Sequence, residues 1–338
     1  MTTRILCFGE LLLRLASPGR ELLLQSPQLQ VHVGGAEANV AIALAGFGHA
    51  AGVIGTVADN ALGRAAAAEL RRYGVDTTRL RFAPGRMGLY FLETGALQRP
   101  SEVLYDRAES AFARAAADHY DWPALLAGAQ FLHLSGVTPA LGRAGADAAV
   151  AAARAARAAG LHVVFDGNFR LKLWQAWDGD PALILGELFA CADTVFADHR
   201  DIGVVLRRDF SGVPAAEIEH AAADAAFRAF PQLRRIAATR RVQHSVDCHD
   251  LSAHVFTRDG VWQLPAQRLD GIVDRIGGGD AFAAGLLHGL LGGRDEDYSL
   301  RFGLAAACLK HSVPGDFLCL DAGRVEALLG EARFDVRR

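Results

Sequence analysis

Short apolar segments alternate with alanine-rich segments through most of the chain that follows residue 120. Residues 131–136 and 161–165 are apolar enough to form buried strands, and the alanine-rich segment 144–159 between them has the length of a helix. Short strands near residues 194–196 and 235–238 flank a second helical segment at 215–229. Strands that alternate with helices form a parallel sheet with helices on both faces. The pattern therefore predicts an α/β fold, whose ligands bind beyond the carboxyl ends of the strands.

Two other regions contain short strands that do not belong to this alternation. Residues 11–33 are leucine-rich pieces broken by Ser-Pro pairs, and residues 88–107 predict a hairpin. We expect both regions to form a small β-sheet that acts as a lid. The chain has no internal repeat, low-complexity tract or linker, and 51% of its residues are hydrophobic. We therefore expect a single domain over residues 1–338.

Composition excludes several classes of protein. The chain has 35 basic and 38 acidic residues and no basic stripe, which argues against a nucleic-acid partner. No apolar run is long enough to cross a membrane, and the first ten residues do not resemble a signal peptide. The five cysteines are scattered without Cys-x-x-Cys spacing, which is typical of a reducing compartment. We expect a cytoplasmic protein with a small-molecule partner and no membrane partner.

Three consecutive glycines precede an aspartate and a helical segment in the C-terminal part of the chain. The order is Asp274-Arg275-Ile276-Gly277-Gly278-Gly279-Asp280. Glycines before a helix leave backbone N–H groups free to bind an anion such as phosphate. The carboxylate of Asp280 would repel that anion, unless its role is to accept a proton beside the phosphate. The alternative is a glycine turn in which Asp280 is an ordinary N-cap residue.

A second pair of glycines precedes a helix near the N-terminus. Gly34 and Gly35 allow the backbone to approach a ligand closely, and Asn39 offers both a hydrogen-bond donor and an acceptor. The alternative is a plain junction between a loop and a helix.

Together these two motifs resemble the two signatures of the PfkB/ribokinase family of sugar kinases. The resemblance implies a ribokinase-like fold, with ATP and Mg²⁺ as cofactors and Asp280 as the catalytic base. It implies that Gly277, Gly278 and Gly279 bind the transferring phosphate. It also implies that the sugar is bound by Gly34, Gly35, Asn39 and the acidic residue Glu10.

The middle of the chain resembles one branch of this family, the kinases of the sugar acid 2-keto-3-deoxygluconate (KDG). The matching residues are Tyr90, Tyr105-Asp106-Arg107, Asp166-Gly167-Asn168-Phe169-Arg170, Leu173-Trp174 and Gly315-Asp316. A carboxylate ligand requires fixed cations, and arginine binds it with two parallel hydrogen bonds. The resemblance implies substrate binding by Tyr90, Tyr105, Arg107, Arg170 and Asp316. It implies transfer of the ATP γ-phosphoryl to the C6 hydroxyl, a step of Entner–Doudoroff type sugar-acid catabolism.

The expected ATP side departs from the family pattern. An Asn-x-x-Glu segment is replaced by Asp198-His199-Arg200-Asp201, and a glycine-rich segment by Thr239-Arg240-Arg241-Val242-Gln243-His244. We expect the ATP phosphates to meet Asn168, Asp198, Thr239 and Arg241, and we assign no residue as a direct metal ligand. The histidines between residues 244 and 254 match no zinc spacing, so we expect a solvated loop there.

Three functions remain open from the sequence. The first is a KDG kinase, and the second is a kinase of the same fold for another sugar such as fructose. The third is a catalytically silent protein of this fold that senses a sugar acid. We also expect a homo-oligomer that forms through the lid.

Overall fold

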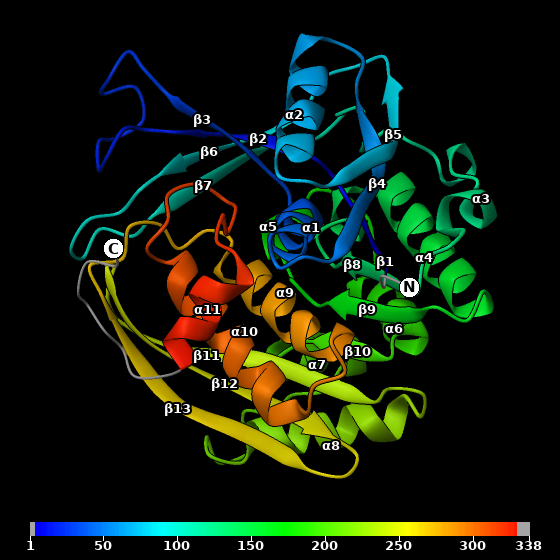
Figure 1. Ribbon diagram of the computed structural model, residues 1–338, viewed down its shortest axis with the longest axis vertical. Coiled ribbons are helices and arrows are strands. Elements are labelled where there is room, and N and C mark those ends of the chain that lie inside the picture. Colours follow the sequence, from blue (N-terminus) through cyan, green and yellow to red (C-terminus); the bar gives the residue numbers. More distant parts are fainter. Residues whose placement is uncertain (1–3, 330–338) are drawn as a thin grey trace.

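The structure is a computed structural model that describes residues 4–329, and a large sheet runs through its centre (Figure 1). The strand order is β13-β12-β11-β10-β9-β8-β1-β4-β5. Neighbouring strands are parallel from β5 to β11, whereas β11, β12 and β13 are antiparallel. The bounds are β1 Arg4–Phe8, β4 Ala50–Ala58, β5 Asp76–Ala83, β8 Phe131–Ser135, β9 His162–Asp166, β10 Thr194–Phe196, β11 Arg235–Ser245, β12 Cys248–Thr257 and β13 Val261–Asp270.

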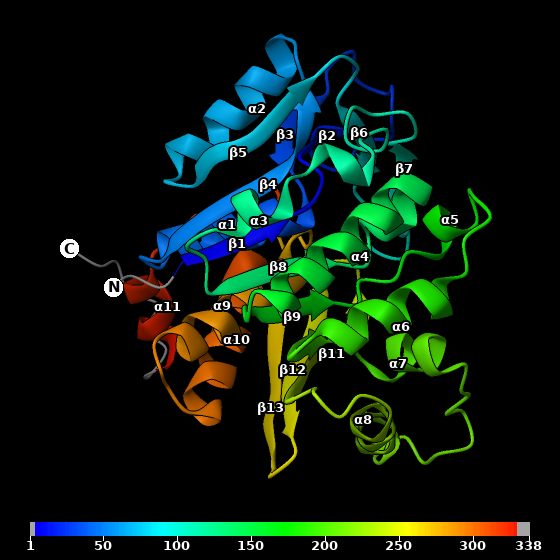
Figure 2. The ribbon, with the colours of Figure 1, turned by 90° about the vertical axis from the view of Figure 1, so that its right-hand side faces the viewer.

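Helices cover both faces of this sheet, each over its own hydrophobic core (Figure 2). One face carries α1 Ala36–Gly46, α2 Ala61–Arg72, α9 Gly278–Leu291, α10 Glu296–Lys310 and α11 Ala322–Leu329. The other carries α3 Trp122–Leu126, α4 Arg143–Ala158, α5 Leu171–Trp174, α6 Pro181–Cys191, α7 His199–Leu206 and α8 Ile218–Ala229. Short 3-10 helices lie at Ala117–His119 and Pro139–Leu141. The predicted α/β class is confirmed.

A separate four-stranded sheet projects from this body in the order β3-β2-β6-β7 (Figure 1). We call it the lid sheet. Its strands are β2 Leu12–Ala16, β3 Gln30–Gly34, β6 Gly88–Glu93 and β7 Glu102–Asp106. Strands β6 and β7 form the predicted antiparallel hairpin, which sets Tyr90 opposite Tyr105, while β2 and β6 are parallel.

The structure corrects three details of the predicted elements. Helix α8 begins at Ile218, three residues later than expected, and α9 begins at Gly278 and so includes two of the three glycines. The expected solvated loop at residues 244–254 is wrong, because β11 and β12 pair as a long hairpin through it. His249 and His254 are buried there. Antiparallel pairing stabilises this polar stretch as strand, and sequence periodicity alone did not indicate it.

No helix in residues 4–329 is both long enough and apolar enough to cross a bilayer.

Candidate active site

The triple-glycine turn packs closely against the backbone of Asp316. Gly277 is the N-cap residue of α9 and has a positive φ of 79°. A Cβ atom at Gly277 would lie 2.0 Å from the backbone oxygen of Asp316, so only glycine fits there. Asp280 lies in the first turn of α9 and is therefore not the N-cap residue that the structural alternative required.

The carboxyl group of Asp280 is held by an amide from a different helix. Asn39 Nδ2 on α1 donates a 2.6 Å hydrogen bond to Asp280 Oδ2. Enclosure by protein raises the pKa of Asp280 to about 6, while the Asn39 hydrogen bond and then the charge of Arg170 act in the opposite direction. A carboxylate with a pKa in this range can accept a proton near neutral pH.

A cavity of about 520 Å³ opens in front of Asp280, between the main sheet and the lid sheet. We call it the lid cavity, because β2, β6 and β7 contribute part of its wall. Many of the predicted site residues line it, namely Gly35, Asn39, Tyr90, Tyr105, Arg107, Asn168, Arg170, Arg241, Gly277, Gly278, Gly279, Asp280 and Asp316. Residues more than 200 positions apart in the sequence thus share one cavity.

Two predicted sugar-binding residues, Glu10 and Gly34, do not line the lid cavity. Glu10 does not line the lid cavity, because its carboxylate accepts hydrogen bonds from Arg107 Nε at 2.7 Å and Ser110 Oγ at 2.5 Å. Gly34 is buried, and a Cβ atom there would lie 2.3 Å from Asp316 Oδ2. Glu10 therefore orients Arg107, and Gly34 leaves room for Asp316.

Buried ion pairs that sequence reasoning missed join the lid sheet to Asp316 and to the turn that precedes α9. Arg14 on β2 pairs with Asp274 at 2.7 Å and with Asp316 at 3.1 Å, and Tyr90 donates a 2.7 Å hydrogen bond to Asp316. The Lys310 side chain is fully buried nearby, and its Nζ donates to the backbone oxygen of Val313. A lone arginine in the apolar run Leu12-Leu13-Arg14-Leu15 was the available signal for a buried ion pair.

A second cavity, of about 770 Å³, lies along β11, and we call it the β11 cavity. Three of the predicted phosphate-binding residues outside the glycines line it, namely Asp198, Thr239 and Arg241. Sequence reasoning placed Thr239 and Arg241 just past the end of a strand, whereas β11 continues through them. Only residues 235–237 of β11 pair with the parallel strand β10. Thr239 and Arg241 therefore lie just beyond the parallel part of the sheet.

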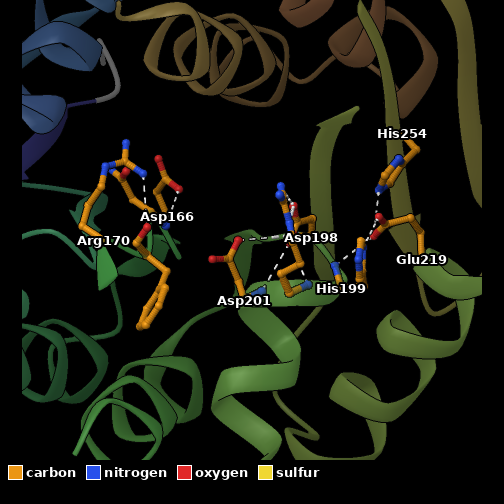
Figure 3. Close-up of polar contacts among 10 residues, drawn as sticks. Asp166, Arg170, Asp198, His199, Asp201, Glu219 and His254 are labelled. Atoms are coloured by element: carbon orange, nitrogen blue, oxygen red, sulfur yellow. Dashed lines mark hydrogen bonds and ion pairs between the residues drawn. The ribbon is translucent and has the colours of Figure 1, made fainter. Parts of the chain in front are cut away.

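A third cavity, of about 420 Å³, is lined by three carboxylates, and we call it the acidic cavity. Asp198 caps α7, and Asp201 completes the capping box with it (Figure 3). Burial and then the charge of Asp198 raise the pKa of Asp201 to about 6, and burial and then Asp280 raise the pKa of Asp166. Within residues 4–329 no three acidic, His or Cys side chains lie close enough together to hold a metal ion directly. A Mg²⁺ ion bound mainly through phosphates and water would still fit these carboxylates.

Glu219 on α8 is a further acidic residue near α7, and no motif in the sequence pointed to it. Its carboxylate accepts hydrogen bonds from the backbone N–H and the ring of His199. The Nε2 atom of His254 lies 4.0 Å from Glu219 Oε2 (Figure 3). His199 and Glu219 both line the β11 cavity.

Comparisons with known proteins show which family the chain is similar to. The model of the pfkB family carbohydrate kinases matches residues 2–322. A 2-dehydro-3-deoxygalactonokinase from Haloferax volcanii is 33% identical over 99% of this chain and 100% of its own length. The crystal structure of a 2-dehydro-3-deoxygluconokinase from Thermotoga maritima is 36% identical, with a TM-score of 0.90 over 96% of this chain and 99% of that one. A putative ribokinase II from E. coli in complex with ATP and Mg²⁺ is 16% identical, a likeness of fold, with a TM-score of 0.81 over 97% of this chain and 99% of that one.

Proposed function

Because this chain belongs to the pfkB family of carbohydrate kinases, we propose that it phosphorylates KDG at the C6 hydroxyl with ATP. It is a sugar kinase, and its relatives support a 2-keto-3-deoxy sugar acid as the class of substrate. The observation that carries the proposal is the position of Asp280, in the lid cavity beside glycines that also line the β11 cavity. KDG would occupy the lid cavity and the ATP phosphates the β11 cavity.

In this proposal Asp280 accepts the proton of the C6 hydroxyl as that oxygen bonds to the γ-phosphorus. Asn39 fixes the carboxylate by its 2.6 Å hydrogen bond. The N–H groups at the start of α9 face the phosphoryl group, where they stabilise negative charge as it develops. Phosphoryl transfer of this kind depends mainly on positioning and charge, so a base with a pKa near 6 is adequate.

We assign the carboxylate of KDG to the arginines of the lid cavity. Arg107 uses its Nε to bind Glu10, and no hydrogen bond occupies its two terminal nitrogens among residues 4–329. Those nitrogens form the planar fork that binds carboxylates. Arg170 lines the same cavity and forms no ion pair with any residue in the described part of the chain. Tyr90, Tyr105 and Asp316 complete the proposed sugar site.

ATP and Mg²⁺ are proposed for the opposite side of Asp280. Asn168, Asp198, Thr239 and Arg241 would meet the nucleotide, and Asp166, Asp198 and Asp201 would hold water molecules bound to Mg²⁺. When bound, Mg²⁺ neutralises part of the phosphate charge. Burial and then neighbouring carboxylates raise the pKa of Asp166 and Asp201, and a cation would balance the negative charge of those carboxylates.

A specific observation favours a second substrate. The relative from Haloferax volcanii is named for the galactonate-derived acid, which differs from KDG only at C4, and it is similar to this chain over its whole length. A coupled assay of ATP consumption should compare KDG, the galactonate-derived acid, gluconate and fructose. We expect the highest kcat/KM with KDG. Highest activity with the C4 epimer would reassign the substrate, and activity with fructose alone would refute the sugar-acid proposal.

We further propose that the lid sheet forms a homo-oligomer interface. Large apolar side chains are exposed on this sheet and its connecting loops: Leu22, Leu24, Val31, Leu97 and Leu104. Exposed apolar side chains that gather on one sheet are typical of an interface. Light scattering after size exclusion should show a dimer or larger species, and the double variant Val31→Asp, Leu104→Asp should shift it to monomer. A monomeric wild-type protein would refute this proposal.

A further inference from the structure

Five residues line both the lid cavity and the β11 cavity. Two are the glycines at the start of α9, and the other three are arginines from separate parts of the chain. The five are Gly278, Gly279, Arg170, Arg241 and Arg275. The boundary between the proposed sugar and nucleotide sites is therefore strongly cationic.

These three arginines differ from three others near the two cavities, whereas Arg240, which lines the β11 cavity alone, likewise has no ion pair among residues 4–329. Arg14, Arg107 and Arg200 each pair with a carboxylate at 3.1 Å or less. Within residues 4–329, Arg170, Arg241 and Arg275 form no ion pair with any carboxylate. Unpaired guanidinium groups that line the same cavities favour an anion there, and those that lie close together repel one another.

Arg241 and Arg275 are close enough to influence each other. The pKa of Arg241 is lowered, first because surrounding protein displaces water from the guanidinium, and then because Arg275 and Arg200 are positive neighbours. The β11 strand holds Arg241, and Arg275 follows Asp274, whose carboxylate accepts bonds from Arg14, Ile276 N and Gly315 N. The backbone at both arginines is therefore held in place.

We propose that Arg275 is a catalytic residue that, with Arg241, binds the phosphoryl group while it crosses from the β11 cavity to the lid cavity. This inference rests on the proposed function. The bond between the γ-phosphorus of ATP and its bridging oxygen breaks, and a bond from that phosphorus to the acceptor hydroxyl oxygen forms. The hydroxyl proton passes to Asp280, and ADP keeps the electron pair of the broken bond. Arg275 touches the equatorial phosphoryl oxygens. Its full positive charge adds to the partial positive charges of the glycine N–H groups.

A group that acts on the phosphoryl only during transfer changes kcat more than it changes substrate binding. We therefore compare R275Q with R275K and with R228Q in the full-length chain. Arg228 on α8 is exposed, has no ion pair among residues 4–329, and lines neither cavity, so it controls for loss of an arginine. Thermal melting of each variant checks its folding.

With the best substrate of the sugar panel, we expect R275Q to lose about 10²- to 10³-fold in kcat, with both KM values nearly unchanged. R275K should recover part of this loss, because lysine restores the charge but not the planar fork. R228Q should keep the wild-type kcat. A kcat for R275Q within about threefold of R228Q overturns the inference and leaves the proposed function intact.

Should the wild-type protein phosphorylate no sugar, the proposed function fails and the arginines are tested by calorimetry. ADP and Mg²⁺ are titrated with and without aluminium fluoride, which mimics the phosphoryl group in transfer. We expect fluoride to tighten ADP binding to the wild-type protein and R228Q, and not to R275Q. Equal tightening in R275Q, or none in the wild type, overturns the inference.

Discussion

Arg14 and Asp316, near opposite ends of the chain, form a buried ion pair of 3.1 Å in which each side chain is 3% exposed. Arg14 also pairs with Asp274, in the turn that leads to the triple glycine. One side chain of the lid sheet therefore fixes two segments that surround Asp280. Arg14 therefore joins the lid sheet to the triple-glycine turn through buried ion pairs.

Replacement of Arg14 by methionine should destabilise the fold strongly. The change leaves the carboxylates of Asp274 and Asp316 without their shared cation, and loss of one member of a buried ion pair costs about 3–5 kcal/mol. Urea denaturation should show this loss. Arg301→Ala breaks the exposed pair with Asp297 and should cost less than about 1 kcal/mol. Equal losses in the two variants would contradict the role given to Arg14.

Asp280→Asn should abolish most of the kinase activity without preventing folding. Asparagine keeps an oxygen for the Asn39 hydrogen bond but cannot accept the hydroxyl proton. Loss of a general base typically lowers kcat about 10²- to 10⁴-fold. Calorimetry should show that ATP and KDG still bind, and Asp118→Asn, at an exposed position, should retain full activity. A near-normal kcat in Asp280→Asn would refute the assignment of the base.

The main sheet, the hairpin of Tyr90 and Tyr105 and the glycine turn were predictable, because each depends on local periodicity or on a short motif. That Glu10 meets the sugar is implied only by the resemblance to the sugar kinases. Its pairing with Arg107 depends on how the lid sheet docks, and local sequence does not encode that contact.

The features that the sequence did not reveal are contacts between distant segments. Lys310 looks like an ordinary charged residue until the fold buries it near Asp274 and Asp316. The apolar run around Arg14 indicates burial, but it does not identify Asp274 and Asp316 as the partners. The β11–β12 hairpin is a local contact, and it was missed because its polar residues lack the apolar alternation from which a strand is predicted. Arg275 was overlooked because its relation to Arg241 appears only where two cavities meet.

The pH dependence of kcat/KM should have an acidic limb near pH 6. Asp280 must be ionised to accept the proton, and its pKa is raised to about 6, so activity should rise through pH 6 and level off above it. Asn39→Ala removes a hydrogen bond that lowers this pKa and should move the limb to higher pH. A limb that does not move in Asn39→Ala would show that another group titrates.

The same pKa predicts how stability depends on pH. The folded pKa of about 6 exceeds the ordinary value of 3.8, so the protonated form favours the folded state. This contribution is complete below pH 3.8 and is lost as the pH rises through 6. Asp280→Asn avoids the buried charge, so its melting temperature should exceed that of the wild type at pH 8. The difference should shrink at pH 5, and a constant difference would contradict this origin.

Arg107→Lys should weaken binding of KDG selectively. Arg107 binds Glu10 through Nε and offers two terminal nitrogens to the cavity, whereas lysine has a single ammonium group for both tasks. A lost charge-assisted hydrogen bond costs about 1.5–3 kcal/mol, so we expect KM for KDG to rise about 10- to 100-fold. KM for ATP should stay near the wild-type value, and Arg114→Lys, at an exposed pair with Glu109, serves as the control.

The assignment of Arg107 to the carboxylate can be separated from a general effect on the lid sheet. An analogue of KDG with a carboxamide in place of the carboxylate removes the charge and keeps the shape. The wild-type protein should prefer KDG over this analogue, and Arg107→Lys should lose most of that preference because the fork no longer meets the two carboxylate oxygens. If both proteins discriminate equally, the carboxylate lies elsewhere, and Arg170, which lines the same cavity, becomes the residue to test.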